Sequence, residues 1–253
     1  MKTIFITGGA LGIGAAVARK FHKEGWSVGL LDINETALTA LAGELGTRVW
    51  WRVLDVTDSN QARAVMDAFV REHDGYLNVL FNCAGILRTG AFEKISPGQH
   101  KSIIDINVTG VINVSHAAFR FLRATPGAMV INMSSASAVY GIPDFASYSA
   151  SKFAVRGLTE ALNLEWEKHD IQVVDVMPPF VRTAMVAQNH SAIMDRMGVD
   201  LDADDIASVV WRVVCQRGGA VHNPVSLSFR ATVLAAKLVP ARVTRALIGF
   251  LSR

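Results

Sequence analysis

Short apolar runs alternate with longer segments of helical period along almost the whole sequence, and this alternation restricts the fold more than any other feature. Strands that alternate with helices form βαβ units, and successive units build a parallel sheet with helices on both faces. The sequence therefore predicts one α/β domain over residues 1–253. The predicted strands cover residues 3–7, 26–31, 48–54, 77–81, 128–133, 171–177 and 220–222. The predicted helices cover residues 14–24, 35–45, 59–73, 100–122, 148–167 and 202–217.

The composition predicts a soluble protein with a large core. Apolar residues make up 51% of the chain, and the net charge of +3 is too small to argue for nucleic-acid binding. The first residues become glycine-rich too early for a signal peptide, and no run reaches the roughly 20 apolar residues of a membrane span. Cys83 and Cys215 lie in apolar surroundings without metal-ligand spacing. We therefore predict two buried free thiols, no metal site and a cytoplasmic location.

A glycine-rich turn follows the first predicted strand and opens the first predicted helix. Gly8, Gly12 and Gly14 have the spacing Gly-x3-Gly-x-Gly. Glycines permit a tight turn and let the backbone approach a pyrophosphate, and a helix N-terminus offers amide donors and a partial positive charge. The position directly after the first strand favours a phosphate-binding turn over an ordinary turn between strand and helix.

Two acidic residues end the next two predicted strands. Asp32 lies about 20 residues beyond the glycines, where a dinucleotide-binding fold places an acid on the adenosine ribose. A carboxylate there repels a 2′-phosphate, and no basic residue stands at Leu11 or Ile33 to bind one, so the sequence favours NAD over NADP. The alternative for Asp32 is a helix cap. Asp55 is placed either to meet the adenine amino group or to form a turn.

A third set of polar residues lies between Ser134 and Lys152. Tyr148 and Lys152 are four residues apart, which places them on one face of a helix, one turn apart. A phenol has an ordinary pKa of about 10, and a neighbouring cation lowers that pKa, so that the tyrosine can transfer protons at neutral pH. Ser135 follows a predicted strand, thirteen residues before Tyr148. Taken alone, such a pair is more often two exposed helix residues.

Polar residues and a proline come at or just past the ends of five predicted strands. Ligands of open α/β sheets bind outside the carboxyl ends of the strands, so a site is expected at this edge. The residues in question are Asp32, Asp55, Asn82, Ser135 and Pro178.

Taken in order, these motifs resemble those of the short-chain dehydrogenase/reductase family. The resemblance runs from residue 3 to about residue 185 and implies a doubly wound, Rossmann-type parallel sheet of about seven strands that binds a nicotinamide cofactor. The chain differs from the family at Pro179, where a glycine is usual, and this proline removes an amide near the expected nicotinamide site. The matching residues are Thr7-Gly8-x3-Gly12-Ile13-Gly14, Asp55-Val56, Asn82-Cys83-Ala84-Gly85, Asn107, Ser135, Tyr148-x3-Lys152 and Pro178-x2-Val181-x-Thr183.

The resemblance implies catalytic roles for four residues. Tyr148 resembles the catalytic acid/base, and Ser135 resembles the serine that orients the substrate oxygen. Lys152 resembles the residue that holds the nicotinamide ribose and lowers the pKa of the phenol. Asn107 resembles the helix residue that anchors a water of the proton relay, a role compatible with a buried asparagine at a helix kink.

The resemblance also implies which residues bind the cofactor, and Val181 and Thr183 resemble the contacts of the nicotinamide carboxamide. No metal is expected. With NAD as the cofactor, the residues expected to bind it are Gly8, Gly12, Ile13, Gly14, Asp32, Asp55, Val56, Asn82, Gly85, Tyr148, Lys152, Pro178, Val181 and Thr183.

These expectations describe an NAD-dependent oxidoreductase that interconverts a secondary alcohol and a ketone. The residues expected around the substrate are mostly apolar, which favours a steroid, retinoid or fatty acyl derivative over a small polyol or sugar alcohol. A non-catalytic NAD-binding sensor and an NADPH-dependent acyl-thioester ketoreductase are the other candidates. The residues expected around the substrate are Leu87, Val139, Tyr140, Phe145, Phe180 and Met185.

Two segments near the C-terminus are expected to complete the enzyme. Residues 182–201 have no clear period and are expected to form a mobile substrate lid, or else a surface loop. Residues 225–253 carry five basic residues and no acid among apolar ones, and Pro240 is expected to divide them into two helices. This basic amphipathic tail is expected to pack against the lid or a partner subunit, or to contact a membrane surface. Apolar helices over residues 103–122 and 153–166 predict a homodimer or homotetramer, because family members usually pair there.

Overall fold

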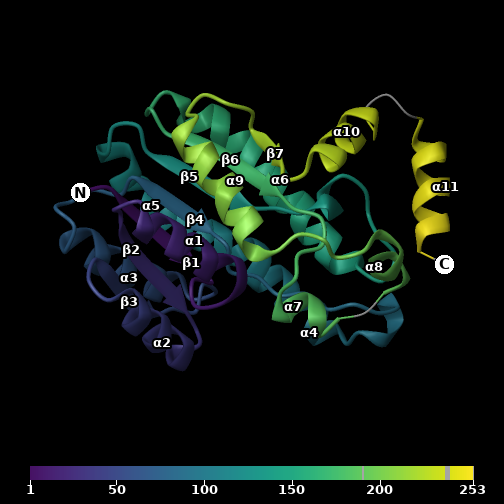
Figure 1. Ribbon diagram of the computed structural model, residues 1–253, viewed down its shortest axis with the longest axis horizontal. Coiled ribbons are helices and arrows are strands. Elements are labelled where there is room, and N and C mark those ends of the chain that lie inside the picture. The colour runs from purple at the N-terminus through teal and green to yellow at the C-terminus, as the bar shows by residue number, and fades with distance from the viewer. Residues whose placement is uncertain (190, 237–239, 253) are drawn as a thin grey trace.

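The computed structural model describes residues 1–189, 191–236 and 240–252, and it contains a parallel sheet between two layers of helices (Figure 1). The seven strands pair in parallel in the order β3-β2-β1-β4-β5-β6-β7. The chain winds outward from β1 in one direction and then from β4 in the other, so the prediction of a doubly wound, Rossmann-type sheet is confirmed. The strands are β1 (Thr3–Thr7), β2 (Ser27–Asp32), β3 (Val49–Val53), β4 (Val79–Asn82), β5 (Met129–Met133), β6 (Gln172–Met177) and β7 (His222–Pro224).

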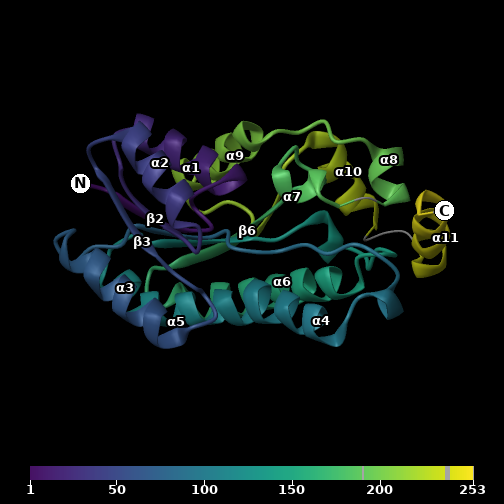
Figure 2. The same ribbon diagram turned by 90° about the horizontal axis from the view of Figure 1, so that it is seen from below.

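Helices cover both faces of the sheet (Figure 2). Successive strand residues point to opposite faces, so Ile4 and Ile6 join one buried apolar cluster while Phe5 between them joins the other. The central strands are therefore apolar throughout, as is usual for a parallel sheet buried on both sides. The helices of one layer are α1 (Gly12–Lys23), α2 (Glu35–Leu45) and α9 (Ala203–Cys215), and those of the other are α3 (Ser59–Arg71), α5 (Gly110–Ala124) and α6 (Ala146–Glu167).

The helix predicted over residues 100–122 is interrupted. It consists of α4 (Pro97–Ile104), a π-helical segment (Asp105–Thr109) and α5. Within the wider turn, Asn107 turns its amide to the loop after β4, and a Cβ on Gly110 would lie only 2.5 Å from Val56 Cγ2. Widened turns of this kind occur mostly at functional sites, and apolar periodicity does not reveal them.

The last strand lies two residues later than predicted, because Pro224 takes part in it. The prediction stopped at His222, whereas β7 begins there. Proline has no amide to donate to a ladder, but β7 is the edge strand of the sheet, so one side of it needs no partner.

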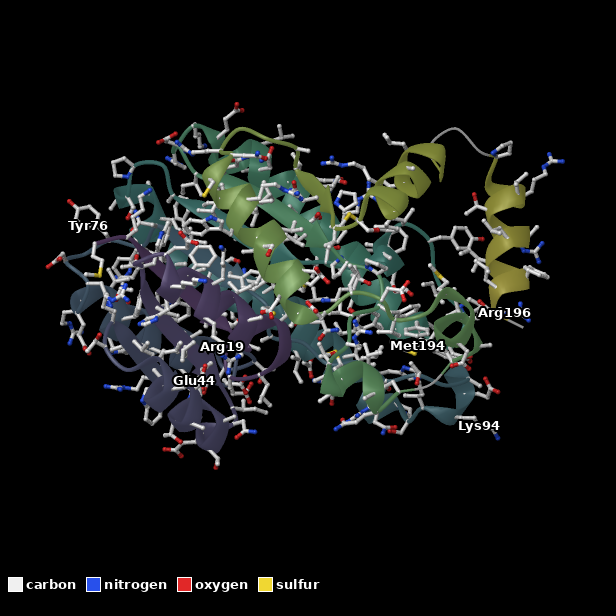
Figure 3. The ribbon with its side chains drawn as sticks, in the orientation of Figure 1. Arg19, Glu44, Tyr76, Lys94, Met194 and Arg196 are labelled. Carbon is white, nitrogen blue, oxygen red and sulfur yellow. The ribbon has the colours of Figure 1, made fainter. Side chains whose placement is uncertain are left out.

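The segment without clear period contains two short helices, α7 (Ala184–Ala187) and α8 (Ala192–Met197). In the tail, Pro240 is the N-cap of α11 (Ala241–Leu251), which follows α10 (Leu227–Ala236); Lys237, between them, lies outside the described residues. Figure 3 shows Arg196 of α8 beside the end of α11. Arg196 Nη1 donates to the Phe250 carbonyl oxygen, and its guanidinium lies 5.1 Å from the centre of the Phe250 ring. These contacts hold α11 on the predicted lid.

One expectation about the thiols is wrong. Cys215 is exposed, because Val213 and Val214 on the last turn of α9 occupy the side that faces the core. Cys83 is partly buried beside the sheet. Among the described residues, no helix is long and apolar enough to cross a membrane, and no three His, Cys, Asp or Glu side chains gather closely enough to hold a metal ion.

Candidate active site

The motif residues from β1, β4, β5 and β6 come together at one edge of the sheet. In the register of the ladder, Thr7 is opposite Asn82, and Asn82 is opposite Asn132, so these strands end level with one another. Thr7 Oγ1 accepts hydrogen bonds from the amides of Cys83 and Ala84 at 3.1 and 3.2 Å. The chain that leaves β4 is thereby held against the glycine-rich turn that leaves β1.

The glycine-rich turn is closely folded on itself. Gly8 has φ +63°, and a Cβ there would lie 2.8 Å from Ala84 Cα. A Cβ on Gly14 would lie 2.0 Å from the Gly8 carbonyl oxygen, so only glycine fits where the turn meets α1. The N-terminus of α1 is left open for an anion, because its N-cap Leu11 offers no side-chain hydrogen bond. The turn therefore fits the diphosphate of a dinucleotide.

Gly12, in the turn after β1, and Thr183, in the segment after β6, lie side by side although they are far apart in the sequence. Gly12 has φ +53°, and a Cβ on it would lie 3.5 Å from Thr183 Cγ2. Thr183 caps α7 by accepting a hydrogen bond from the Val186 amide at 3.4 Å. Despite Pro179, the loop that carries Thr183 keeps a defined path, because the Pro178 carbonyl accepts from the Ala136 amide at 2.9 Å.

The two acids at the ends of β2 and β3 have different surroundings. Asp32 Oδ2 accepts from the Ala10 amide of the glycine-rich turn at 3.2 Å, and Oδ1 accepts from the Asn34 amide at 3.1 Å. Each oxygen keeps a lone pair, so Asp32 can still bind a ribose. Asp55 Oδ1 accepts from the amide and the hydroxyl of Thr57, which is the turn that the sequence allowed for.

Ser135, Tyr148 and Lys152 meet at the centre of this edge. Ser135, just past β5, lies close enough to Tyr148 of α6 for its hydroxyl to act on the pKa of the phenol, and Ser135 Oγ accepts from the Ser137 amide at 3.2 Å. The Lys152 ammonium lies 5.5 Å from the centre of the Tyr148 ring and donates to the Met133 carbonyl oxygen at 2.8 Å. Ser134 is also buried, but its hydroxyl has no partner among the described residues and takes no part in this group.

Burial dominates the protonation of this group. Loss of solvent around the phenol raises the pKa of Tyr148 to about 12, although the hydrogen bond from Ser135 acts in the opposite direction. Burial likewise lowers the pKa of Lys152 to about 8. Lys152 is not among the groups that act on the pKa of the phenol here, and its ammonium is bonded to the Met133 carbonyl, so a lowering of that pKa by Lys152 stays a prediction.

Asn107 lies behind the catalytic group rather than within it. Its side-chain oxygen accepts from the Ile86 amide at 2.8 Å, and its side-chain nitrogen donates to the Ile86 carbonyl at 3.0 Å and to Ser151 Oγ at 3.1 Å. A Cβ on Gly85 would lie 3.2 Å from Asn107 Oδ1 and 3.9 Å from Lys152 Nζ. Asn107 thus fixes the loop after β4 against the helix that carries Tyr148 and Lys152.

Comparison with known proteins accounts for this arrangement. A family model described as short chain dehydrogenase matches residues 2–193. The chain belongs to the short-chain dehydrogenase family. It is 34% identical over 244 residues to a 3alpha-hydroxysteroid dehydrogenase of Mediterraneibacter gnavus, an alignment that covers 88% of this chain and 97% of the relative.

Other relatives of this dehydrogenase differ in their substrates. A (+)-borneol dehydrogenase of Salvia officinalis is 33% identical, with 81% of this chain and 84% of the relative aligned. Among solved structures, a short-chain dehydrogenase/reductase from Burkholderia phymatum in complex with NAD has a TM-score of 0.83 at 25% identity, with 92% of each chain covered. The chain is therefore an oxidoreductase of a family that binds nicotinamide cofactors.

Two residues expected to bind the cofactor have side chains that do not reach the edge of the sheet. Asn82 is buried, and its amide nitrogen donates to Ser115 Oγ and Asn132 Oδ1, which joins β4 to α5 and β5. The Val56 side chain packs against Gly110 in the core. In this dehydrogenase, these two side chains position the strand ends.

An apolar cluster lies beside Tyr148. Leu87, Phe145 and Phe180, which were expected here, belong to it, whereas Met185 is exposed and Val139 and Tyr140 lie outside it. Sequence reasoning missed the members Ile142, Ile193, Met194, Val186 and Leu251.

The missed residues left different signals in the sequence. The apolar period of the tail is a signal that could have found Leu251, which extends from α11 to the cluster. The lid residues Ile193 and Met194 lie in a helix of only six residues, which is too short to show a period. The Met133 carbonyl that accepts from Lys152 is a backbone group, and every residue has one, so the sequence could not predict this contact.

Proposed function

We propose that this dehydrogenase uses NAD to interconvert a secondary alcohol and a ketone on a substrate with a hydrophobic body. The observation that carries the proposal is the meeting of Ser135, Tyr148 and Lys152 next to the glycine-rich turn. A proton donor, its orienting hydroxyl and a cation beside a nucleotide-binding turn are the groups that hydride transfer to or from a carbonyl needs.

In the proposed reaction, different residues of the chain bind the substrate, transfer the proton and hold the cofactor. When bound, NAD⁺ supplies the hydride acceptor and a positive ring charge that favours the Tyr148 phenolate. Ser135 and Tyr148 bind the substrate oxygen, and Tyr148 Oη takes the hydroxyl proton in oxidation and returns it in reduction. Because burial keeps the phenol protonated, Tyr148 is ready to donate in the direction of ketone reduction. Lys152 holds the ribose and, through Met133, the end of β5.

The apolar cluster supports a hydrophobic substrate. It places Phe145, with its ring centre 6.3 Å from that of Tyr148, and Phe180 where the body of the substrate would lie. The hydroxysteroid and borneol dehydrogenases among the relatives are named for alcohols with large apolar skeletons. A panel of hydroxysteroids and long-chain secondary alcohols against polyols, followed by NADH absorbance, tests this class. Turnover of the polyols alone would favour the sugar-alcohol candidate, and NADH binding without turnover would favour the sensor.

A second candidate, reduction of an acyl thioester, is favoured by several of the relatives. The chain is 34% identical over 187 residues to a 3-oxoacyl-[acyl-carrier-protein] reductase of Thermotoga maritima, with 73% of this chain and 76% of the relative aligned. Adding a 3-oxoacyl thioester to the same panel, with NADH and NADPH in turn, distinguishes the two candidates.

Removing the charge of Asp32 should change the cofactor preference. In the Asp32→Asn variant, the bond from the Ala10 amide can persist while the repulsion of a 2′-phosphate is lost. We expect NADH affinity to fall about tenfold and NADPH affinity to rise, since a charge-assisted hydrogen bond contributes roughly 1.5–3 kcal/mol. Fluorescence titration with both cofactors measures the change. Glu35→Gln, an exposed acid three residues away, is the control, and an unchanged NADH/NADPH ratio in Asp32→Asn would contradict the NAD assignment.

The Leu164→Glu substitution should dissociate the expected homodimer or homotetramer. Leu164 on α6 is 73% exposed, and Ile112 on α5 and Phe153 on α6 are also exposed, which is unusual for apolar side chains without a partner surface. We expect wild-type protein to run as a dimer or tetramer and Leu164→Glu to run as a smaller species in light-scattering chromatography. Leu234→Glu, at an exposed leucine of α10, should leave the mass unchanged.

A further inference from the structure

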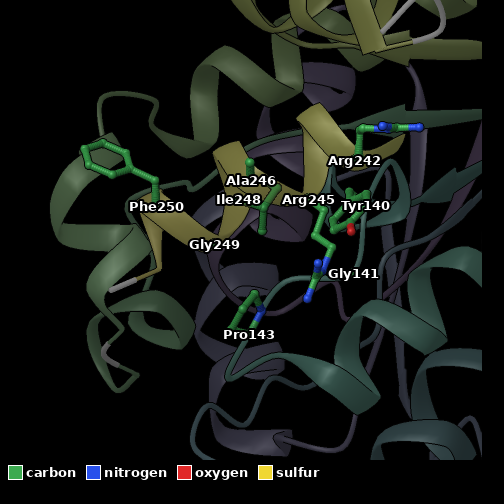
Figure 4. A pocket seen from close by; sticks show the side chains of 9 residues that line it. All are labelled: Tyr140, Gly141, Pro143, Arg242, Arg245, Ala246, Ile248, Gly249 and Phe250. Atoms are coloured by element: carbon green, nitrogen blue, oxygen red, sulfur yellow. The ribbon is translucent and has the colours of Figure 1, made fainter. Parts of the chain in front are cut away.

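A cavity of about 560 Å³ lies between α11 and the loop from Tyr140 to Pro143 (Figure 4). Its size falls within the range of pockets that bind small organic molecules. One wall is the loop, with Tyr140, Gly141 and Pro143, and the other is the face of α11 that carries Arg245 and Ile248. The cavity is therefore formed by a segment next to the catalytic residues and by the C-terminal helix.

The loop wall connects this cavity to the catalytic group. Ile142, between Gly141 and Pro143, donates its amide hydrogen to Ser149 Oγ at 3.2 Å, one residue beyond Tyr148. The Ile142 side chain belongs to the apolar cluster that Tyr148 and Leu251 adjoin. A substrate whose oxygen lies at Tyr148 and whose body follows this cluster would thus have its far end at α11.

The helical wall of the cavity is basic. Arg242 and Arg245 both line it, and Figure 4 shows the Arg245 side chain extending from α11 towards the loop at Pro143. Among the described residues, no carboxylate lies within ion-pair distance of either guanidinium. Residues 225–253 contain no acid at all. Two unpaired guanidinium groups at a cavity of this size give it the charge that suits an anion.

Arg196, unlike Arg242 and Arg245, has contacts that fix its guanidinium. Its side chain is occupied by the Phe250 carbonyl and ring, so it holds α11 in place. Arg245 lies five residues before Phe250 on α11, has no such contact and is not needed to hold that helix.

We infer that the substrate of this dehydrogenase carries an anionic group, such as a carboxylate, at the end far from its hydroxyl, and that Arg245 binds that group. The inference rests on the proposed function and specifies its substrate class: a hydrophobic secondary alcohol with an acidic terminus. The planar guanidinium forms two parallel hydrogen bonds to a carboxylate, which neither an ester nor an amide can replace.

Matched pairs of ligands test the inference. A hydroxycholanoic acid and a mid-chain hydroxystearic acid are each compared with their neutral methyl esters, and dissociation constants are measured by calorimetry in the presence of NADH. We expect the wild-type protein to bind each acid about tenfold or more tightly than its ester, as a charge-assisted bond implies. In Arg245→Gln this ratio should fall to within about twofold while the affinity for the ester stays unchanged, and Arg245→Lys should recover part of it.

Arg230→Gln is the matched control, because it removes the same charge from the same tail. Arg230 lines a separate cavity of about 300 Å³ beside β7. A drop in the acid-to-ester ratio in Arg230→Gln as large as in Arg245→Gln would mean that the general charge of the tail attracts acids, and would overturn the inference. So would equal ratios in the wild-type and Arg245→Gln proteins, or a wild-type protein that binds neither acid. Selective binding of the acids without NADH formation from any alcohol would instead refute the proposed function and leave the binding of the anion by Arg245 supported.

Discussion

Tyr148→Phe should lose alcohol oxidation and ketone reduction together, with kcat/KM lower by about 10²–10⁴-fold, while NADH binds as in the wild-type protein. The variant keeps the ring that packs against Phe145 and the Lys152 side chain and removes only the phenol oxygen on the side of Ser135. Stopped-flow or steady-state NADH absorbance measures the rates, and fluorescence titration measures NADH binding. The loss should fall on kcat more than on KM, because the proton moves only in the chemical step.

The pH dependence of the wild-type enzyme gives the same assignment an independent test. Oxidation needs the phenolate, so its rate should rise with pH, and reduction needs the phenol, so its rate should fall. The pKa of Tyr148 is raised to about 12 by burial, so the reduction rate should stay high through the neutral range. In Tyr148→Phe the residual rates should lose this dependence.

Tyr76→Phe provides the control for the removal of a phenol oxygen. Tyr76 is 49% exposed and lies at the opposite end of the molecule from Met194 and Arg196 (Figure 3). Full turnover by Tyr148→Phe would contradict the assignment of Tyr148 as the catalytic acid/base. An equal loss of turnover in Tyr76→Phe would contradict it as well.

The sequence was a good guide where function depends on side chains that recur in motifs. The spacing of Tyr148 and Lys152 on a helical turn and the position of Ser135 after β5 were enough to predict that the three meet. The order of strands and helices was enough to predict the doubly wound sheet, because a parallel sheet buried on both faces needs apolar runs separated by helices.

What the sequence did not predict depends on backbone groups and on contacts distant in the chain. The Met133 carbonyl sets the position of Lys152, and burial sets the protonation of Tyr148, yet neither leaves a residue pattern. The π-helical turn at Asn107 has the same apolar period as an ordinary helix. Leu251 reaches the apolar cluster from the far end of the chain, which only the folded structure reveals.

Lys152→Met should abolish turnover and at the same time stabilise the protein. The Lys152 side chain is 5% exposed, and burial lowers its pKa from 10.5 to about 8, so at neutral pH the folded protein holds an ammonium in an unfavourable place. A shift of this size corresponds to about 3 kcal/mol, and loss of the bond to Met133 costs about 1 kcal/mol in return. We therefore expect the free energy of unfolding, measured without added cofactor, to rise by about 2 kcal/mol at pH 7 in Lys152→Met.

The pH dependence of that stabilisation has a definite sign. Between pH 8 and 10.5 the unfolded chain holds the lysine proton more tightly than the folded protein does, so the contribution of Lys152 to stability becomes less unfavourable as pH rises. The advantage of Lys152→Met over the wild-type protein should therefore be largest at and below pH 7 and should shrink through this range. The pKa values of Tyr148 and Cys83 are both raised to about 12, so these groups also make the fold less stable at higher pH. The charge of Lys152 lowers the pKa of Cys83, so removing it raises that pKa further, which acts in the same direction as the expected shrinkage.

Lys94→Met is the control, since Lys94 is exposed and its removal should change neither stability nor turnover. Urea unfolding of the three proteins at pH 7 and pH 10 gives the required free energies. If Lys152→Met were less stable than the wild-type protein at pH 7, the ammonium would be well solvated or paired. Turnover close to the wild-type rate in this variant would show that neither ribose binding nor proton transfer depends on the lysine. Because the two readouts move in opposite directions, a partly unfolded variant cannot imitate the expected result, which is a lysine that reduces the stability of the fold and is needed for turnover.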